Sequence, residues 1–221
     1  MFQLKSINKT YQVRDRDVAA IDDVTLGIAA GDFVAVIGPS GSGKSSLLLM
    51  LGGMLSPTSG KVYMNQLSLY DLTPNERASL RKTKMGFVFQ TFNLIPYLTA
   101  LQNVQLPLLL EGLEAHEQES RAKQLLERVG LGDRFDHRPS ELSVGQQQRI
   151  ALARMLANEP EIILADEPTG NLDPAMAEQV MDFLTTLNEE GKTIVMVTHD
   201  MKIASRAKRT VMISKGGRLA A

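Results

Sequence analysis

The chain has 221 residues, of which 43% are hydrophobic and 22% charged, with a formal net charge of -1 and no cysteine. This composition excludes a disordered chain, and the missing cysteines exclude disulfides, thiolate metal sites and thiol nucleophiles. A net charge close to zero argues against a general nucleic-acid binder, because such proteins carry an excess of Lys and Arg. The three histidines, His116, His137 and His199, lie too far apart in the sequence to indicate a metal site.

No segment reads as a leader or a membrane span. The first residues lack the basic and apolar pattern of a secretory signal. The longest apolar run, residues 46–55, is broken by Gly52-Gly53 and falls short of the ~20 residues that cross a bilayer. We therefore expect a chain that is soluble by itself, with any membrane part carried by another chain.

Apolar and polar residues alternate along 2–11 and 18–28, which predicts two half-buried strands joined by a turn at Asp15-Arg16-Asp17. Short, wholly apolar runs are typical of strands buried on both faces of a parallel sheet. Such runs occupy residues 33–37, 85–89, 162–165, 194–197 and 211–213.

Helices are predicted between these strands. One occupies residues 45–51, and a second begins at Thr73-Pro74-Asn75-Glu76, where Thr caps, Pro takes the first helical position and Glu closes a capping box. A third begins at Asp173-Pro174 and runs to about residue 188. Alternating strands and helices predict an α/β fold with a parallel sheet.

The alternation stops between residues 98 and 159, where the pattern is helical and no strand is convincing. Residues 114–129 carry charge on one side and Leu125, Leu126 and Val129 on the other. We interpret this stretch as a helical subdomain inserted into the α/β core.

The segment Gly38-Pro39-Ser40-Gly41-Ser42-Gly43-Lys44-Ser45 matches the phosphate-binding P-loop and lies between a predicted strand and a predicted helix. Glycines let successive N–H groups point at phosphate oxygens, and the helix adds its positive N-terminus. Lys44 then reaches the β- and γ-phosphates, and the Ser45 hydroxyl binds Mg²⁺.

Two adjacent acids, Asp166 and Glu167, follow the apolar run at 162–165. Ligands bind at the carboxyl ends of strands in open α/β sheets. Adjacent strand residues point in opposite directions, so the two acids can take different roles. We expect Asp166 in the Mg²⁺ shell and Glu167 as a base beside the γ-phosphate; the alternative is an acidic helix cap, since Pro168 follows.

A further motif is the stretch Leu142-Ser143-Val144-Gly145-Gln146. Together with the P-loop and the acidic pair, it makes the chain resemble an ATP-binding-cassette (ABC) ATPase, the nucleotide-binding subunit of an ABC transporter. The resemblance covers nearly the whole chain and includes Gln90 after a strand, Asn171-Leu172-Asp173 and His199. It implies a P-loop NTPase core with a mostly parallel sheet, an antiparallel β subdomain at the N-terminus and an inserted all-helical subdomain. Residues 1–221 would form one nucleotide-binding domain, with the α/β core at 1–90 and 160–221 and the helical subdomain at 91–159.

The resemblance also assigns roles. Glu167, His199, Gln90 and Lys44 would be catalytic, with Gln90 joining the core to the helical subdomain and His199 contacting the γ-phosphate. Ser45, Gln90 and Asp166 would hold Mg²⁺. The ATP-binding set is Tyr11, stacked on adenine, with Gly38, Pro39, Ser40, Gly41, Ser42, Gly43, Lys44, Ser45, Ser46, Ser143, Gly145 and Gln146.

Ser143 and Gln146 have the spacing of a capping box, so the helix that follows presents an anion site at its N-terminus. In the family, this end binds the ATP held by the P-loop of a second subunit, which implies an ATP-dependent head-to-tail homodimer. The family usually has Gly where this chain has Val144. As the first helical residue, Val144 would have negative φ, which a β-branched residue tolerates.

Residues 87–100 are similar to the branch with lipoprotein-releasing ATPases, macrolide exporters and cell-division ATPases. This similarity implies integral membrane permease subunits docking near Gln90–Leu101, and a peripheral location on the cytoplasmic face of the inner (cell) membrane. Phe92, Leu94, Ile95 and Tyr97 would line a groove for the partner, or would instead cover the helical core.

We expect an ATP-hydrolysing motor subunit, with ATP and Mg²⁺ as cofactors, that couples dimerisation to export or extraction of a substrate by separate membrane subunits. The alternative is a cell-division-type ATPase that signals through a membrane partner and transports nothing. DNA-repair and ribosome-acting ABC ATPases need long coiled coils or two cassettes on one chain, and this sequence has neither; no nucleic-acid partner is expected.

Overall fold

The computed structural model describes residues 1–14 and 16–220. Its first sheet, sheet A, is antiparallel with strand order β2-β1-β4-β5. The strands are β1 (Phe2–Val13), β2 (Arg16–Ile28), β4 (Ser59–Met64) and β5 (Leu67–Ser68). The predicted turn is wrong at Arg16 and Asp17, which already belong to β2, while Asp15 lies outside the described residues.

The second sheet, sheet B, is parallel throughout, with strand order β6-β7-β8-β3-β9. Its strands are β3 (Phe33–Ile37), β6 (Met85–Phe89), β7 (Ile162–Asp166), β8 (Thr193–Thr198) and β9 (Arg209–Met212). The parallel sheet predicted from the apolar runs is therefore confirmed, and β7 and β8 extend one residue beyond the predicted limits at their carboxyl ends.

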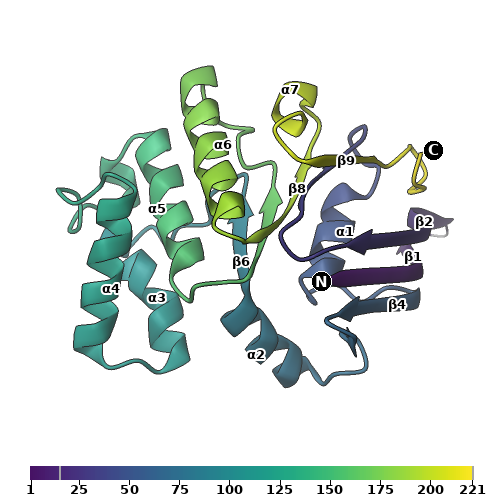
Figure 1. Ribbon diagram of the computed structural model, residues 1–221, viewed down its shortest axis with the longest axis horizontal. Helices are drawn as coiled ribbons and strands as arrows, with labels where there is room; N and C mark the ends of the chain where they lie inside the picture. Colours follow the sequence, from purple (N-terminus) through teal and green to yellow (C-terminus); the bar gives the residue numbers. More distant parts are fainter. Residues whose placement is uncertain (15, 221) are drawn as a thin grey trace.

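The helices are α1 (Lys44–Leu51), α2 (Pro74–Lys84), α3 (Ala100–Glu111), α4 (Ala115–Arg128), α5 (Val144–Leu156), α6 (Pro174–Glu189) and α7 (Met201–Ala204), with a 3₁₀ turn at Pro139–Glu141. In Figure 1, α3, α4 and α5 gather at one end of the molecule and sheet A lies at the other. None of the helices in the described ranges combines the length and apolar character needed to cross a bilayer.

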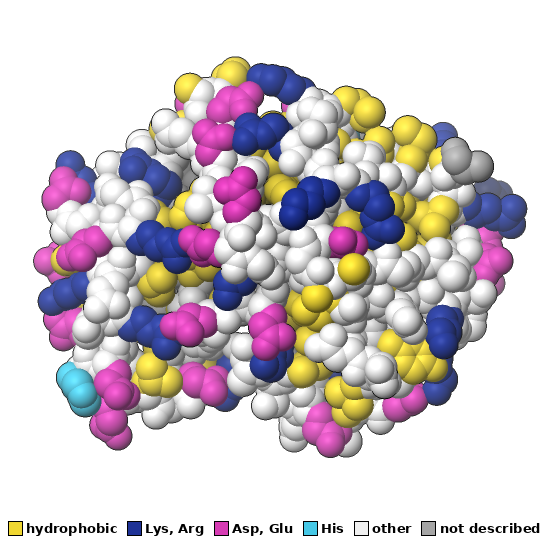
Figure 2. Space-filling view, in the orientation of Figure 1, with side chains coloured by type: hydrophobic (Ala, Val, Ile, Leu, Met, Phe, Trp, Pro, Cys, Tyr) yellow, Lys and Arg dark blue, Asp and Glu magenta, His cyan; other side chains and the backbone are white. Residues whose placement is uncertain are grey.

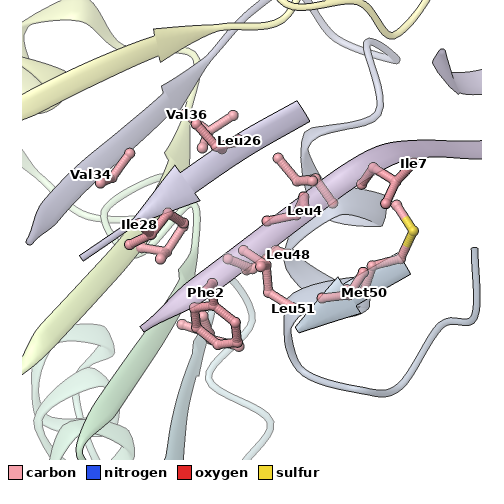
Figure 3. Packing of buried hydrophobic residues seen from close by; sticks show 14 of the residues in the cluster. Phe2, Leu4, Ile7, Leu26, Ile28, Val34, Val36, Leu48, Met50 and Leu51 are labelled. Atoms are coloured by element: carbon pink, nitrogen blue, oxygen red, sulfur yellow. The ribbon is translucent and has the colours of Figure 1, made fainter. Parts of the chain in front are cut away.

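Successive side chains along each strand of sheet B point to opposite faces of the sheet, so the sheet separates two hydrophobic cores. Val34 and Val36 face a first core shared with sheet A and α1. Figure 3 shows Phe2 and Leu4 of β1 packed beside Leu48 of α1 in this core. Phe33, Ala35 and Ile37 face a second core shared with α5, α6 and α7. Both faces of sheet B are therefore covered, which holds its strand ends, and the loops after them, in fixed positions.

The third core is helical and contains Ala100, Val104, Leu126 and Ile150. Helix α5 contributes to two cores, because Leu152 and Leu156 face sheet B while Ile150 and Ala153 face α3 and α4. Burial on two opposite sides makes α5 the rigid connection between the helical region and the sheet.

Candidate functional site

The P-loop joins β3 to α1, and its glycines are required by its shape. Gly43 takes the N-cap position of α1 with φ of +93°, and no side chain caps that helix end. A Cβ on Gly43 would collide with the backbone carbonyl oxygen of Ala20. The N–H groups that open α1 thus lack a side-chain acceptor, and such a helix N-terminus is suited to bind an anion.

Lys44, the first residue of α1, is buried against this loop. Its ammonium donates to the backbone oxygens of Gly38 at 2.9 Å and Pro39 at 3.1 Å. Among the described residues, no carboxylate forms an ion pair with it, and the buried hydroxyl of Ser42 has no partner. A buried cation with only neutral partners, next to an unpartnered hydroxyl, fits a bound anion such as a phosphate chain.

Ser45 and Asp166 converge from α1 and from the end of β7. The Ser45 hydroxyl donates to Asp166 Oδ1 at 3.1 Å. Burial raises the pKa of Asp166, an effect that the Ser45 hydrogen bond partly offsets. A hydroxyl and a single carboxylate fit Mg²⁺, which uses one or two carboxylates together with substrate phosphates. The described residues hold no group of three or more His, Asp and Glu side chains placed for a metal.

Glu167 lies just past β7, so the prediction that it alternates with Asp166 along a strand is wrong. Its φ is +46°, a left-handed conformation that costs a residue with a Cβ about 1–3 kcal/mol. Neighbouring backbone fixes this turn: Glu167 N–H donates to the Val197 oxygen at 3.0 Å, and Gly170 N–H donates to the Glu167 oxygen at 3.1 Å. The two carboxylates have different partners: Asp166 accepts from Ser45, whereas Glu167 contacts Thr198 and His199.

His199 follows β8 and lies beside Glu167. Its Nδ1 is 2.7 Å from Glu167 Oε1, and the ring is 65% exposed. The structure thus brings His199 and Glu167 together at the carboxyl ends of adjacent strands. Most of the ring is exposed to solvent.

Gln90 follows β6 and contacts the segment after Glu167. Its Nε2 donates to Asn171 Oδ1 at 3.4 Å, and Asn171 Nδ2 donates to the Gln90 backbone oxygen at 2.9 Å. Gln90 therefore pairs with Asn171 rather than with Ser45 or Asp166, the two residues that we expected beside it at Mg²⁺.

Tyr11 lies near the end of β1, and its hydroxyl is 3.2 Å from the Ser46 hydroxyl at the start of α1. The Lys9 ammonium lies 5.2 Å from the centre of the Tyr11 ring. A hollow of about 210 Å³ opens beside them, lined by Ala20, Gly41, Gly43, Lys44, Ser45 and Ser46. The N-terminal hairpin thus reaches the P-loop hollow through Ala20, and the exposed Tyr11 ring lies next to the hollow at Ser46.

Ser143, Gly145 and Gln146 form a separate site at the start of α5. Gln146 N–H donates to the Ser143 hydroxyl at 3.3 Å, and Ser143 N–H donates to Gln146 Oε1 at 2.9 Å. Val144 is the first residue of the helix and its φ is not positive, as predicted; its side chain is 48% exposed. A Cβ on Gly145 would collide with the sulfur and terminal methyl of Met176 on α6, so a larger residue here would displace that flexible side chain.

Of the residues expected at a partner groove, Phe92 is buried and Leu94 packs against the helical core, whereas Tyr97 is 72% exposed. An apolar groove of about 400 Å³ lies nearby, between α2, α3 and β6. Its lining includes Met54, Arg81, Phe87, Leu106, Leu110 and Arg154.

Sequence reasoning missed several contacts around these sites. Thr198 donates to Glu167 Oε2 at 3.0 Å, and Gln148 Nε2 donates to the Pro168 oxygen at 2.9 Å. The Arg154 guanidinium donates to the Phe92 and Asn93 oxygens at 2.6 and 2.7 Å. The sequence did offer a signal for Thr198, because it is a polar residue at the end of a wholly apolar run. The contacts of Gln148 and Arg154 depend on the tertiary fold and have no such signal.

Comparison with known proteins supplies the family. Residues 21–170 match the family described as ABC transporter. An uncharacterized ABC transporter ATP-binding protein of Methanocaldococcus jannaschii, MJ0796, is 47% identical over 221 residues, covering 98% of this chain and 94% of that protein. The macrolide export ATP-binding/permease protein MacB of Syntrophobacter fumaroxidans is 48% identical over 98% of this chain, which spans 31% of MacB.

A solved structure agrees in fold. The dimeric post-hydrolysis state of the MJ0796 cassette, bound to ADP and Pi, superposes with a TM-score of 0.92 at 45% identity, covering 100% of this chain and 97% of that one. The α/β fold with its parallel sheet, antiparallel sheet and helical insertion is thereby confirmed, as is the resemblance noted from the motifs. The chain is an ATP-binding cassette that belongs to the ABC transporter family.

Proposed function

We propose that this chain is the ATP-hydrolysing motor subunit of a membrane transport complex. The observation that carries the proposal is the convergence of a buried, unpaired Lys44, the Ser45–Asp166 pair and Glu167 at the carboxyl ends of sheet B. These groups offer a cation for phosphates, oxygen ligands and a carboxylate that can accept a proton from water. This set fits phosphoryl transfer, in which catalysis is mostly positioning and charge stabilisation.

Each residue has a proposed task. Lys44 and the N–H groups at the start of α1 bind the phosphate chain, and Tyr11 stacks on the base. Glu167 orients the attacking water and accepts its proton, while His199 holds Glu167 Oε1 and faces the γ-phosphate. Ser45 and Asp166 would hold Mg²⁺, with Gln90 joining them once its side chain leaves Asn171, and the ion would neutralise charge that develops on the phosphates.

Two half-sites on one chain support a shared-site dimer. In the described residues, no hydrogen bond or ion pair joins the start of α5 to the P-loop. We propose that the capped N-terminus of α5, with Ser143, Gly145 and Gln146, completes the ATP site of a second copy. The dimers formed by the MJ0796 cassette support this arrangement.

We further propose that membrane permease subunits dock near Gln90–Leu101 and along the groove between α2 and α3. The groove has an apolar floor, and Arg81 and Arg154 line it without an acidic residue. An amphipathic helix with an acidic edge fits such a surface. Residues 91–159 would then move as a helical subdomain against a core of 1–90 and 160–221, with the chain held at the cytoplasmic face of the membrane.

A nucleic-acid partner is not part of the proposal. Figure 2 shows acidic and basic side chains interspersed over the visible face, with no extended basic patch there. Export or extraction by the membrane subunits remains the favoured use of the motor. The permease fused to the cassette in MacB supports it over signalling without transport. Purification of the native complex and identification of its membrane subunit would separate these two uses.

Substitution of Lys44 tests the catalytic proposal. The wild-type chain should hydrolyse ATP in the presence of Mg²⁺, and Lys44→Ala should abolish hydrolysis and weaken nucleotide binding. Phosphate release and fluorescent-nucleotide titration measure the two effects. Lys61→Ala, at an exposed position on β4, is the matched lysine control and should leave both unchanged. Wild-type turnover in Lys44→Ala would remove the P-loop from the mechanism.

A further inference from the structure

The carboxylate of Glu167 is held on both of its oxygens by consecutive residues. Oε1 lies 2.7 Å from His199 Nδ1, and Oε2 accepts a hydrogen bond from the Thr198 hydroxyl at 3.0 Å. The two residues that contact the carboxylate differ in exposure: the His199 side chain is 65% exposed, whereas Thr198 is 1% exposed. The histidine is free to turn toward a ligand, but the threonine is fixed in the sheet.

The direction of the threonine bond is set by a second contact. Asp200 N–H donates to Thr198 Oγ1 at 3.1 Å. Because an N–H can only donate, the Thr198 oxygen acts as acceptor on that side and its single proton is directed to Glu167. The hydroxyl thus fixes Oε2 and leaves Oε1 to the exposed His199 ring.

Packing does not account for this hydroxyl. The rest of β8 beyond Thr193 is the apolar run Ile194-Val195-Met196-Val197, buried between two cores. A valine at position 198 would have nearly the same shape and the same β-branched backbone preference. A buried hydroxyl is costly unless it is hydrogen-bonded, so Thr198 is explained by the groups that it bonds.

We propose that Thr198 is a positioning residue that orients the Glu167 carboxylate for reaction. The strained turn at Glu167 places its backbone, and the Thr198 hydroxyl then selects which way the carboxylate faces. Thr198 acts through Glu167 and does not itself touch the nucleotide. This inference rests on the proposed ATPase function.

Two substitutions at Thr198 and one matched control test it. Thr198→Val removes the hydroxyl but keeps the shape, and Thr198→Ser keeps the hydroxyl. Thr193→Val is the control, because Thr193 begins the same strand, is also 1% exposed and accepts a hydrogen bond from Gly31 N–H at 3.0 Å. In Thr198→Val the freed Asp200 N–H meets water, since Asp200 is exposed.

Thr198→Val should lower kcat for ATP about 10- to 100-fold, the effect of losing one hydrogen bond to a charged group, with KM and the melting temperature close to those of Thr193→Val. Thr198→Ser and Thr193→Val should keep kcat within about twofold of the wild type. Adding Thr198→Val to Glu167→Gln should lower kcat little further, because the two residues act as one unit.

The inference is overturned if Thr198→Val keeps wild-type kcat while the wild type hydrolyses ATP normally. Equal loss of kcat in Thr198→Val and Thr193→Val, or independent effects of Thr198→Val and Glu167→Gln, would equally overturn it. In each of these cases the proposed ATPase function stands. Absence of hydrolysis by the wild type itself overturns both.

Discussion

At the scale of single residues, Asp166 shows a conflict between stability and function. Its carboxylate lies at the end of β7, where burial raises its pKa above the usual range. An acid whose pKa is raised by folding holds its proton more tightly in the native state. At pH values above its folded pKa, the ionised group therefore destabilises the fold, and this penalty disappears below its unfolded pKa.

Asp166→Asn should accordingly raise the melting temperature of the nucleotide-free chain at pH 7, because Asn removes the charge while its oxygen still accepts from Ser45. The gain should shrink as the pH falls toward the ordinary range for Asp, near about pH 4. Thermal unfolding followed across this pH range measures the effect. The same variant should lose Mg²⁺-dependent hydrolysis, and an unchanged or lower melting temperature at pH 7 would contradict the argument.

The candidate site residues that the sequence predicts are those whose chemistry demands a fixed spacing. Gly43 and Lys44 are neighbours in the P-loop motif because Gly43 allows the loop its tight turn, while the Lys44 side chain must extend toward the space that the loop encloses. Asn171 and Thr198 gave a weaker signal, since their partners Gln90 and Glu167 are distant in the chain. The left-handed turn at Glu167 had no local cue, because a glutamate rarely adopts it and only the tertiary fold enforces it.

At the scale of elements, the capping boxes separate a structural effect from a functional one. Ser143 on α5 and Thr73 on α2 cap their helices with the same bond, each accepting from the third helical N–H at 3.3 Å. Removal of either hydroxyl should cost about 1 kcal/mol of folding free energy. Only Ser143 lies at a proposed nucleotide contact.

Ser143→Ala and Thr73→Ala should therefore lower the melting temperature by similar amounts, about 2–4 °C for a chain of this size. Hydrolysis at saturating ATP should fall in Ser143→Ala and stay near the wild-type rate in Thr73→Ala. Parallel melting curves and phosphate-release assays make the comparison. Equal activity in the two variants would reduce Ser143 to a helix cap.

Strands and helices with a clear pattern of apolar residues or a helix cap in their own sequence were predicted well, and elements without such a pattern were missed. Strands β3 and β6 match the prediction to the residue, because five consecutive apolar residues suit burial on both faces. Strand β4 went unseen, since only Val62 and Met64 of its six residues are buried and its pairing with β1 is long-range. Helix α7 is only four residues long and depends on the Asp200 cap, so it lacks the periodicity that predicts a helix.

At the scale of the whole molecule, the proposed shared site would be complete only when two copies meet. The P-loop side carries Lys44, Asp166 and Glu167, while the capped end of α5 belongs to the helical region packed on its own core. Helix α5 connects the two regions, because it packs against sheet B on one side and against α3 and α4 on the other. Opening and closing of a dimer would therefore move α5 as a unit.

Glu167→Gln should trap the closed dimer. Gln keeps the size of the side chain but cannot take a proton from water, and general-base contributions are typically about 10²–10⁴-fold, so hydrolysis should fall by that factor. Binding should survive, because Lys44, Ser45 and Asp166 are unchanged. A chain that binds ATP without hydrolysing it should elute as a dimer in ATP with Mg²⁺ and as a monomer in ADP during size-exclusion chromatography.

The second substitution tests which surfaces meet in that dimer. Ser143→Arg places a bulky side chain where the γ-phosphate held by the other copy should dock, so Glu167→Gln with Ser143→Arg should return to a monomer in ATP. Thr73→Arg in the same background adds the same bulk and charge at a capped helix away from the shared site, and it should stay dimeric. If Glu167→Gln remains a monomer at saturating ATP, a repeat with the membrane subunit decides the cause. A dimer formed only with that subunit would make it part of the closed state, whereas a monomer in both cases would refute the shared-site dimer.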